Sequence, residues 1–153
     1  MTETDIGFAS AADLDALADL LAELFTLESD FMADRAKQLA GLRCIVDNPA
    51  LGRLFVLRMN GQVVGMANAL ITVSTAEGGR VLLLEDVILK RECRGHGLGR
   101  RLVEHVFAWA AQAGLMRVTL LADRDNAAAL AFYQRLGFSP SSMQVLRKAL
   151  AQT

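Results

Sequence analysis

Residues 94–99 read Arg-Gly-His-Gly-Leu-Gly and separate an apolar run, residues 80–89, from a helix-like run, residues 98–113. Glycine inside an ordered element costs about 0.5–1 kcal/mol relative to alanine, so three alternating glycines indicate a need for uncovered backbone. A helix N-terminus carries unpaired N–H groups and about half a positive charge. The stretch therefore predicts a strand, a glycine turn and a helix whose first N–H groups can bind a phosphate.

Two other phosphate-binding loops do not fit this spacing. A nucleoside-triphosphate loop needs Gly, four residues and then Gly-Lys-Ser/Thr, and the chain has no such run. A dinucleotide fold needs Gly-x-Gly-x-x-Gly near the start of repeated βαβ units, whereas this chain has Gly-x-Gly-x-Gly after predicted antiparallel strands. Arg94, Arg100 and Arg101 add positive charge, which favours a pyrophosphate over a glycine turn that binds nothing.

The rest of the chain reads as strands and helices around this junction. Asn60-Gly61 between two apolar runs is the strongest short signal of a hairpin. A first helix is expected after Ser10, where apolar residues form a stripe over 14–25, and further helices are expected over 34–47, 98–113 and 126–137. Strands are expected over 4–8, 53–59, 62–73, 80–89, 116–122 and 143–150. This order predicts an α+β fold, a mixed and mostly antiparallel central sheet flanked by helices, in a single domain over residues 1–153.

Composition limits the class of protein. Hydrophobic residues make up 53% of the 153 residues and charged residues 22%, which argues against disorder. No apolar run approaches the roughly 20 residues of a membrane helix, and the N-terminus lacks a basic region followed by an apolar core. Cys44 and Cys93 do not form a disulfide framework. We therefore expect a cytoplasmic protein with reduced thiols and no membrane partner.

Charge is unevenly distributed along the chain. The net charge of −1 argues against a general nucleic-acid binder. Residues 1–40 hold nine Asp or Glu and two Lys or Arg, whereas residues 90–153 hold four Asp or Glu and ten Lys or Arg. This asymmetry indicates a cationic ligand at one end and an anionic ligand at the other, and two merely solvated faces are the alternative.

Two motifs in this order resemble the GNAT family of N-acetyltransferases. The first is that family's Arg/Gln-x-x-Gly-x-Gly/Ala loop, and the second is the Asn, Phe-Tyr, Gly-Phe pattern of its last helix. The matching residues are Arg94, Gly97, Gly99, Asn126, Phe132, Tyr133, Gly137 and Phe138. Residues 82–99, LLLEDVILKRECRGHGLG, look most like the diamine (polyamine) acetyltransferase branch. The order of elements fits too, so the resemblance covers nearly the whole chain.

The resemblance implies acetyl-coenzyme A as co-substrate. Its pyrophosphate would bind the glycine loop, its pantetheine arm would pair with the end of the preceding strand, and an asparagine of the last helix would hold that arm. The residues implied in coenzyme binding are Val87, Ile88, Leu89, Arg94, Gly95, His96, Gly97, Leu98, Gly99, Arg100 and Asn126. Most of these contacts use the backbone, so side-chain identity at several of these positions matters little.

Glu85 and Asp86 form an acidic pair in an otherwise apolar strand. Burial disfavours their charge, so each needs a partner or a role. Alternation along a strand places Glu85 on one face with Val87 and Leu89, and Asp86 on the other, unless a bulge intervenes. The resemblance implies that Glu85 is the base or the ammonium anchor for the acceptor amine, and a carboxylate paired with a buried Arg or Lys is the alternative. Asp86 is expected to be structural.

Tyr133 is the only tyrosine of the chain. The resemblance implies that it gives a proton or a hydrogen bond to the departing sulfur of the coenzyme. Its alternative is a tyrosine at the edge of a core, on an amphipathic helix. Cys93-x-x-His96 lacks a second pair at ligand spacing, so we expect no metal site.

The acceptor is the least determined part of the reaction. Glu28, Asp30 and Phe31, in the predicted loop 26–34, would suit a cationic amine with some apolar body. We therefore expect an N-acetyltransferase that acts directly on a small-molecule primary amine, with a homodimer left open. A protein lysine or N-terminal acetyltransferase and a non-catalytic coenzyme A-binding module are the alternatives.

Overall fold

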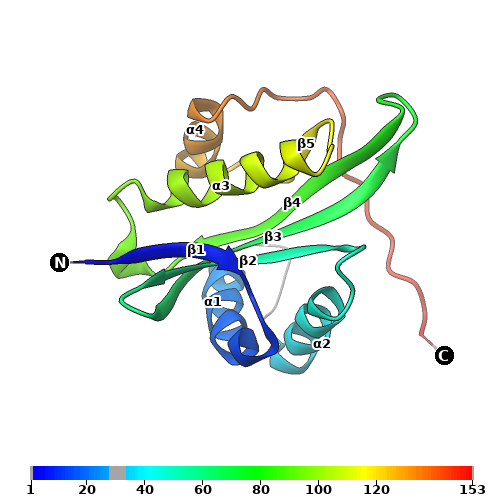
Figure 1. Ribbon diagram of the computed structural model, residues 1–153. Helices are drawn as coiled ribbons and strands as arrows, with labels where there is room; N and C mark the ends of the chain where they lie inside the picture. The colour runs from blue at the N-terminus through cyan, green and yellow to red at the C-terminus, as the bar shows by residue number, and fades with distance from the viewer. Residues whose placement is uncertain (1, 28–33, 153) are drawn as a thin grey trace. The chain divides into compact units, whose positions relative to one another are not determined.

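The computed structural model describes residues 2–27 and 34–152, and the backbone divides into two compact units. The first unit comprises residues 1–121 and holds a sheet with helices on both of its faces (Figure 1). The second comprises residues 122–153 and holds one helix, α4. Within the described residues, no helix is both long and apolar enough to cross a membrane.

The sheet of the first unit has five strands in the order of the chain. They are β1 (Thr4–Phe8), β2 (Gly52–Met59), β3 (Gln62–Ser74), β4 (Gly79–Leu89) and β5 (Val118–Leu120). The first four strands pair antiparallel, and β5 pairs parallel to β4. The predicted α+β class, with a mixed and mostly antiparallel sheet, is confirmed.

The hairpin between β2 and β3 turns at the predicted dipeptide. Asn60 has φ 51° and Gly61 has φ 82°, and Met59 pairs with Gln62 on either side. Two consecutive positive φ values define a turn whose twist matches that of the strands, which is why Asn-Gly is favoured there. The turn therefore sets the register between β2 and β3 at its start.

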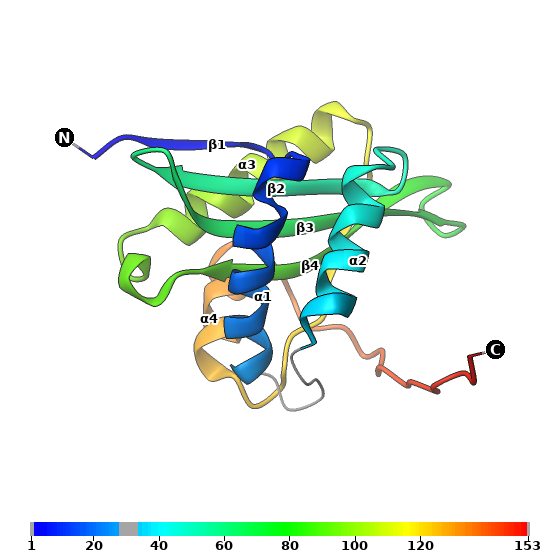
Figure 2. The same cartoon turned by 90° about the horizontal axis from the view of Figure 1, so that it is seen from below.

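The helices cover the two faces of the sheet. α1 (Leu14–Leu27) and α2 (Arg35–Val46) lie on one face and α3 (Leu98–Gln112) on the other (Figures 1 and 2). The core on the α1 face is apolar and contains Leu14, Leu17, Ala18, Leu20, Leu21, Leu42, Leu54, Val56, Met66 and Ile88. On the α3 face, the rings of Phe55 and Trp109 lie 5.3 Å apart in an edge-on arrangement. The apolar sides predicted for the helices at 14–25 and 98–113 therefore both pack against the sheet.

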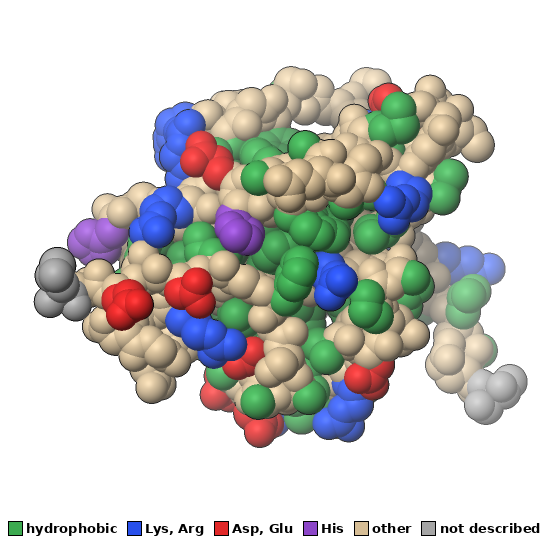
Figure 3. Space-filling model, viewed as in Figure 1, with side chains coloured by type: hydrophobic (Ala, Val, Ile, Leu, Met, Phe, Trp, Pro, Cys, Tyr) green, Lys and Arg blue, Asp and Glu red, His purple; other side chains and the backbone are tan. Residues whose placement is uncertain are grey.

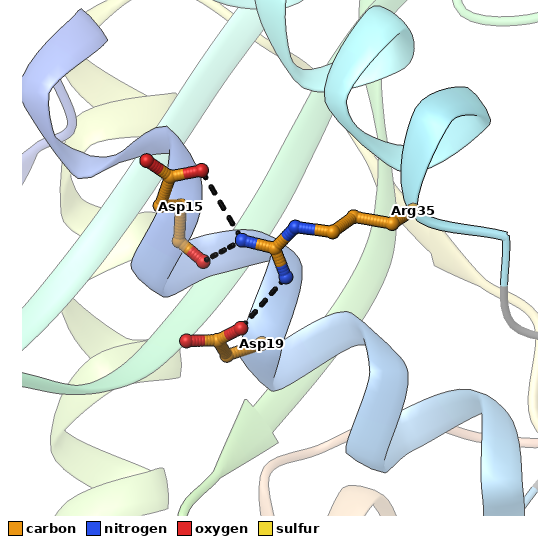
Figure 4. A network of polar contacts seen from close by, with 3 residues as sticks. All are labelled: Asp15, Asp19 and Arg35. Carbon is orange, nitrogen blue, oxygen red and sulfur yellow. Dashed lines mark hydrogen bonds and ion pairs between the residues drawn. The ribbon is translucent and has the colours of Figure 1, made fainter.

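A single arginine connects the two helices of the α1 face. Arg35, at the first residue of α2, reaches Asp15 at 3.1 Å and Asp19 at 2.7 Å, both on α1 (Figure 4). All three side chains are largely exposed, so the pair of ionic contacts adds little free energy of unfolding. The arginine links the first residue of α2 to α1, and Leu42 of α2 packs in the apolar core that the two helices share.

The second unit differs from expectation after its helix. α4 (Ala127–Arg135) begins at the predicted place and ends before Gly137, which has φ 99°. Residues 143–150 form no strand, so the predicted closing strand is wrong for the described chain. A strand needs a hydrogen-bonded neighbour, and the alternation of apolar residues in a sequence cannot supply one. Met143, Leu146 and Leu150 are exposed instead.

Candidate functional site

β4 extends well beyond its parallel neighbour. The pairing with β5 covers Leu82–Leu84 only, whereas β4 continues to Leu89. Beyond Leu84, β3 is the only strand of the described chain that is hydrogen-bonded to β4. The other edge of residues 85–89 therefore offers backbone N–H and C=O groups that could pair with an extended ligand, apart from the Leu89 carbonyl, which accepts a hydrogen bond from Arg94.

A bulge interrupts β4 at this open edge. Asn68 pairs with Glu85 and Met66 pairs with Ile88, so Asp86 and Val87 together face one residue of β3. Since Asn68 and Met66 share a face, Glu85 shares that face with Ile88, and the predicted grouping with Val87 and Leu89 is wrong. Ile88 belongs to the core on the α1 face, so Glu85 also lies on the α1 face.

Asp86 is held in an unusual conformation at the bulge. Its φ is +23°, which non-glycine residues rarely adopt. Its carboxyl Oδ2 accepts a hydrogen bond of 3.1 Å from Nδ2 of Asn68, which is buried. Burial raises the pKa of the Asp86 carboxyl above its usual value, although the hydrogen bonds from Asn68 and from its own backbone N–H act to lower it. The Oδ1 atom of Asn68 is buried and has no hydrogen-bond partner.

The glycine loop presents uncovered backbone at the start of α3. Gly95 and Gly97 have φ 82° and 78°, and a Cβ built on either would meet no atom within 4 Å. The backbone N–H of Arg101 donates to the carbonyl of Gly97 at 3.2 Å, so the N–H groups of Leu98, Gly99 and Arg100 precede the first intrahelical bond. Unpaired N–H groups and a helix dipole are features that suit an anion, and here they follow the open edge of β4 within a few residues.

Three arginines surround this end, and each has a protein partner. Arg94 donates from Nε to the carbonyl of Leu89 and from Nη2 to Glu23 of α1, both at 3.0 Å. Arg100 pairs with Glu104 one turn along α3, and Arg101 donates to the hydroxyl of Thr4. Arg94 thus fastens the loop to β4 and α1. His96 is exposed, whereas the Leu98 side chain is buried, so Leu98 has only its backbone N–H to offer a ligand.

The uneven charge of the sequence is partly neutralised in space. Acidic residues of the first 40 pair with basic residues far along the chain, as Glu23 does with Arg94 and Asp13 with Arg58. Figure 3 shows acidic and basic side chains interspersed on the face that it draws. Glu28, Asp30 and Phe31, predicted to bind the acceptor, lie outside the described residues.

In the second unit, the two predicted site residues have clear local surroundings. Asn126 caps α4, since its side-chain oxygen accepts the backbone N–H of Ala129 at 3.1 Å. Tyr133 is half-buried between two phenylalanine rings, Phe132 at 5.1 Å and Phe138 at 5.7 Å. The aromatic contacts fix the plane of the Tyr133 ring, which is compatible with either a packing or a chemical role.

Sequence reasoning did not single out Asn68. It is the one polar side chain in the run VVGMANALI, residues 63–71, opposite an acidic pair in the next strand. A lone polar side chain at a buried strand position needs a partner, and that signal was present in the sequence. Among the residues that the structure describes, no group of three His, Cys, Asp or Glu could hold a metal ion.

Comparison with known proteins agrees with this geometry. The profile of the acetyltransferase (GNAT) family matches residues 14–138. The chain belongs to this family. Over 94 residues it is 30% identical to glucosamine 6-phosphate N-acetyltransferase of Trypanosoma brucei brucei, a match that covers 61% of this chain and 62% of that relative. Matches to other curated relatives cover less of their length, as with the 39% of the rat protein N-acetyltransferase family 8 member 2.

Solved structures show the same GNAT fold. A possible acetyltransferase from Clostridium difficile has a TM-score of 0.87 at 18% identity, over 97% of this chain and 99% of that one. Aminoglycoside N-acetyltransferase AAC(6')-Iy, solved in complex with CoA, has a TM-score of 0.83 at 19% identity, over 99% of this chain and 97% of that one. At such identities the likeness establishes the fold of this GNAT protein and leaves its substrate to chemical argument.

Proposed function

We propose that this chain is an N-acetyltransferase that moves an acetyl group from acetyl-coenzyme A directly to a primary amine of a small cationic molecule. One observation carries the proposal. The open edge of β4, residues 85–89, leads within a few residues to the glycine loop and the first turn of α3. The open strand edge fits an extended arm that contains amides, and the start of the helix fits an anionic group at the end of that arm.

The coenzyme would use mostly the backbone of the chain. Val87, Ile88 and Leu89 would pair with the pantetheine arm, and the N–H groups from Gly95 to Arg100 would bind the pyrophosphate. The three N–H groups that precede the first intrahelical bond of α3 support the second assignment. Arg94 would act by holding the loop in place, because its guanidinium already binds Leu89 and Glu23. Asn126 would hold the arm from the start of α4.

Acetyl transfer needs a free amine, a polarised carbonyl and a stabilised thiolate. Glu85 would anchor or deprotonate the ammonium from the α1 face of β4. A backbone N–H at the open edge would polarise the thioester carbonyl. As the N–C bond forms and the C–S bond breaks, Tyr133 would give a proton or hydrogen bond to the sulfur. The products are an amide, the coenzyme thiol and one proton released to solvent.

Carboxylates favour a cationic acceptor. Glu85 lies on the α1 face of β4, and Asp86 is bound there by Asn68. Glu28, Asp30 and Phe31 remain predicted contacts of the acceptor. The likeness of residues 82–99 to the diamine branch favours diamines, and the names of the trypanosomal relative and of AAC(6')-Iy favour amino sugars. Both are small amines, which we prefer over protein lysines as acceptors.

The domain and the assembly are further parts of the proposal. The family profile covers residues 14–138 and therefore extends across both compact units. This extent supports a single N-acetyltransferase domain over residues 1–153. A homodimer is compatible with the exposed apolar residues of segment 143–150, and the oligomeric state of the purified chain would decide it.

A thiol-release assay tests the proposal. The purified chain is mixed with acetyl-coenzyme A and, in turn, diamines, aminoglycosides, glucosamine 6-phosphate, amino acids and a lysine peptide. We expect release of coenzyme A thiol with at least one small cationic amine, and weaker release with the peptide. Coenzyme binding in calorimetry without turnover of any amine would favour a binding module, and absence of binding would overturn the proposal.

A further inference from the structure

The backbone at Asp86 is strained in a way that a glycine would avoid. A φ of +23° costs an L-residue free energy, and among non-glycine residues Asp and Asn tolerate positive φ best. Such residues persist where surrounding structure enforces them, and they gather at functional sites. Here the strained residue carries a carboxyl and lies in the part of β4 where regular pairing with β5 has already ended.

Asn68 is suited to hold this carboxyl in either protonation state. In the charged state, Nδ2 of Asn68 donates a hydrogen bond to Oδ2 of Asp86, which is the 3.1 Å contact in the structure. When Asp86 is protonated, a rotated amide can present its oxygen to the new O–H, because an asparagine side chain has both a donor and an acceptor. The unpartnered, buried Oδ1 of Asn68 is the acceptor that this second state needs.

Few charges surround the pair. β3 has no ionisable residue, and neither has β5. On α1, which packs on this face, Asp15 and Asp19 bind Arg35 and Glu23 binds Arg94. Glu85 precedes Asp86 in β4 and lies on the same face as Asn68. Burial is therefore the main cause that raises the pKa of Asp86, and this direction suits a group that must take up a proton near neutral pH.

We infer that Asp86 is the base of the reaction, which takes the proton that the acceptor ammonium must lose, and that Asn68 is its positioning residue. The inference rests on the proposed function and divides the roles of the acidic pair, with Glu85 as the ammonium anchor. The ammonium N–H bond breaks and the Asp86 O–H bond forms, which leaves a neutral amine to attack the thioester. After transfer, Asp86 returns its proton to solvent.

The main test is Asp86→Asn, since Asn tolerates the same backbone and cannot titrate. We expect kcat at neutral pH to fall by about 10²–10⁴, the range that general base catalysis supplies. Coenzyme affinity should stay unchanged. Melting temperature at neutral pH should not fall, because a carboxyl whose folded pKa is raised opposes folding once the pH exceeds that pKa. Asp13→Asn is the matched control, which should lose stability and keep kcat.

A pH profile separates a base from a structural residue. In the wild-type chain, kcat/KM should fall at acid pH as Asp86 is protonated, and Asp86→Asn should lack this acidic limb. Asn68→Leu keeps the burial and removes the hydrogen bond that stabilises the charged carboxyl, so the limb should move to higher pH. In a carbon NMR titration without coenzyme, the carboxyl signal missing from Asp86→Asn should titrate above the usual aspartate value of about 3.9.

The opposite results would overturn the inference. Asp86→Asn with full kcat and an intact acidic limb would make Asp86 structural, whatever its melting temperature. Loss of the limb in Glu85→Gln alone would assign the proton to Glu85. In either case the wild-type chain still releases thiol, so the proposed function stands. A wild-type chain that turns over no amine overturns the proposed function and this inference with it.

Discussion

Gly97→Glu tests the phosphate site directly. The two glycines that flank α3, Gly97 and Gly114, have φ 78° and 79°, and a Cβ on either meets no atom within 4 Å. A side chain at either position therefore brings the same backbone strain, about 1–2 kcal/mol, and no clash. For a chain of this size that corresponds to a fall in melting temperature of about 2–8 °C. Gly114→Glu is thus a matched control for Gly97→Glu.

The two variants should differ in coenzyme affinity. A carboxylate about 4 Å from a phosphate charge costs roughly 4 kcal/mol at an effective dielectric constant near 20. Solvent screening at an exposed loop reduces this cost, so we expect Gly97→Glu to weaken coenzyme binding by at least about 10²-fold. Gly114→Glu should bind the coenzyme as the wild-type chain does. The stability of Gly97→Glu should equal or exceed that of the control, because a carboxylate suits a helix N-terminus.

Calorimetry with coenzyme A and a thermal melt measure both quantities on the same samples. Equal coenzyme affinity in the two variants would refute the phosphate assignment at the start of α3. A large loss of stability in Gly97→Glu alone would show instead that Gly97 is needed for folding. The phosphate assignment requires that Gly97→Glu alone loses coenzyme affinity and that it is no less stable than Gly114→Glu.

Three further outcomes are expected. Tyr133→Phe should lower kcat by about 10²–10⁴ and leave KM and melting temperature nearly unchanged; an active but less stable variant would make the hydroxyl structural. Burial acts to raise the pKa of the Asp13 carboxyl, but the hydrogen bonds from Arg58 and Ser10 outweigh this, so the pKa is lowered overall. The stability that Asp13→Asn loses at pH 7 should therefore shrink as the pH falls below about 3.8, which thermal melts at acid pH would measure. Gly52→Ala puts a Cβ 2.3 Å from the Ala69 carbonyl oxygen and should cost about 1–3 kcal/mol in urea unfolding, whereas Gly7→Ala meets nothing and should be neutral.

Local signals in the sequence predict much of this fold. Asn60-Gly61 marks the first hairpin because its turn chemistry is local. The glycines before α3 mark the strand–turn–helix junction for the same reason. Residues 143–150 fail as a strand because pairing is not local: an alternating run specifies a face and leaves its partner unspecified.

The residues of the candidate site were likewise predictable only where the signal in the sequence is local. The glycine loop, Glu85 and Tyr133 could be named from motifs, since each motif is short and contiguous. The contact of Asp86 with Asn68 could not be predicted, because it depends on a bulge between two strands. Alternation alone grouped Glu85 with Val87 and Leu89, whereas the register of β3 against β4 groups it with Ile88. Residues that act through tertiary register therefore escape motif reasoning even when each is visible as an odd polar residue.

The bulge at Asp86 and Val87 also has a consequence for solubility. A strand that continues beyond its neighbour exposes a row of backbone groups on which a second chain could add a strand and begin aggregation. Proteins protect such edges with bulges and with charged side chains, and the free part of β4 has both within two residues. The irregular register breaks the even spacing that a foreign strand would need. We therefore expect the kinked edge to accept a flexible coenzyme arm more readily than a strand added from a second chain.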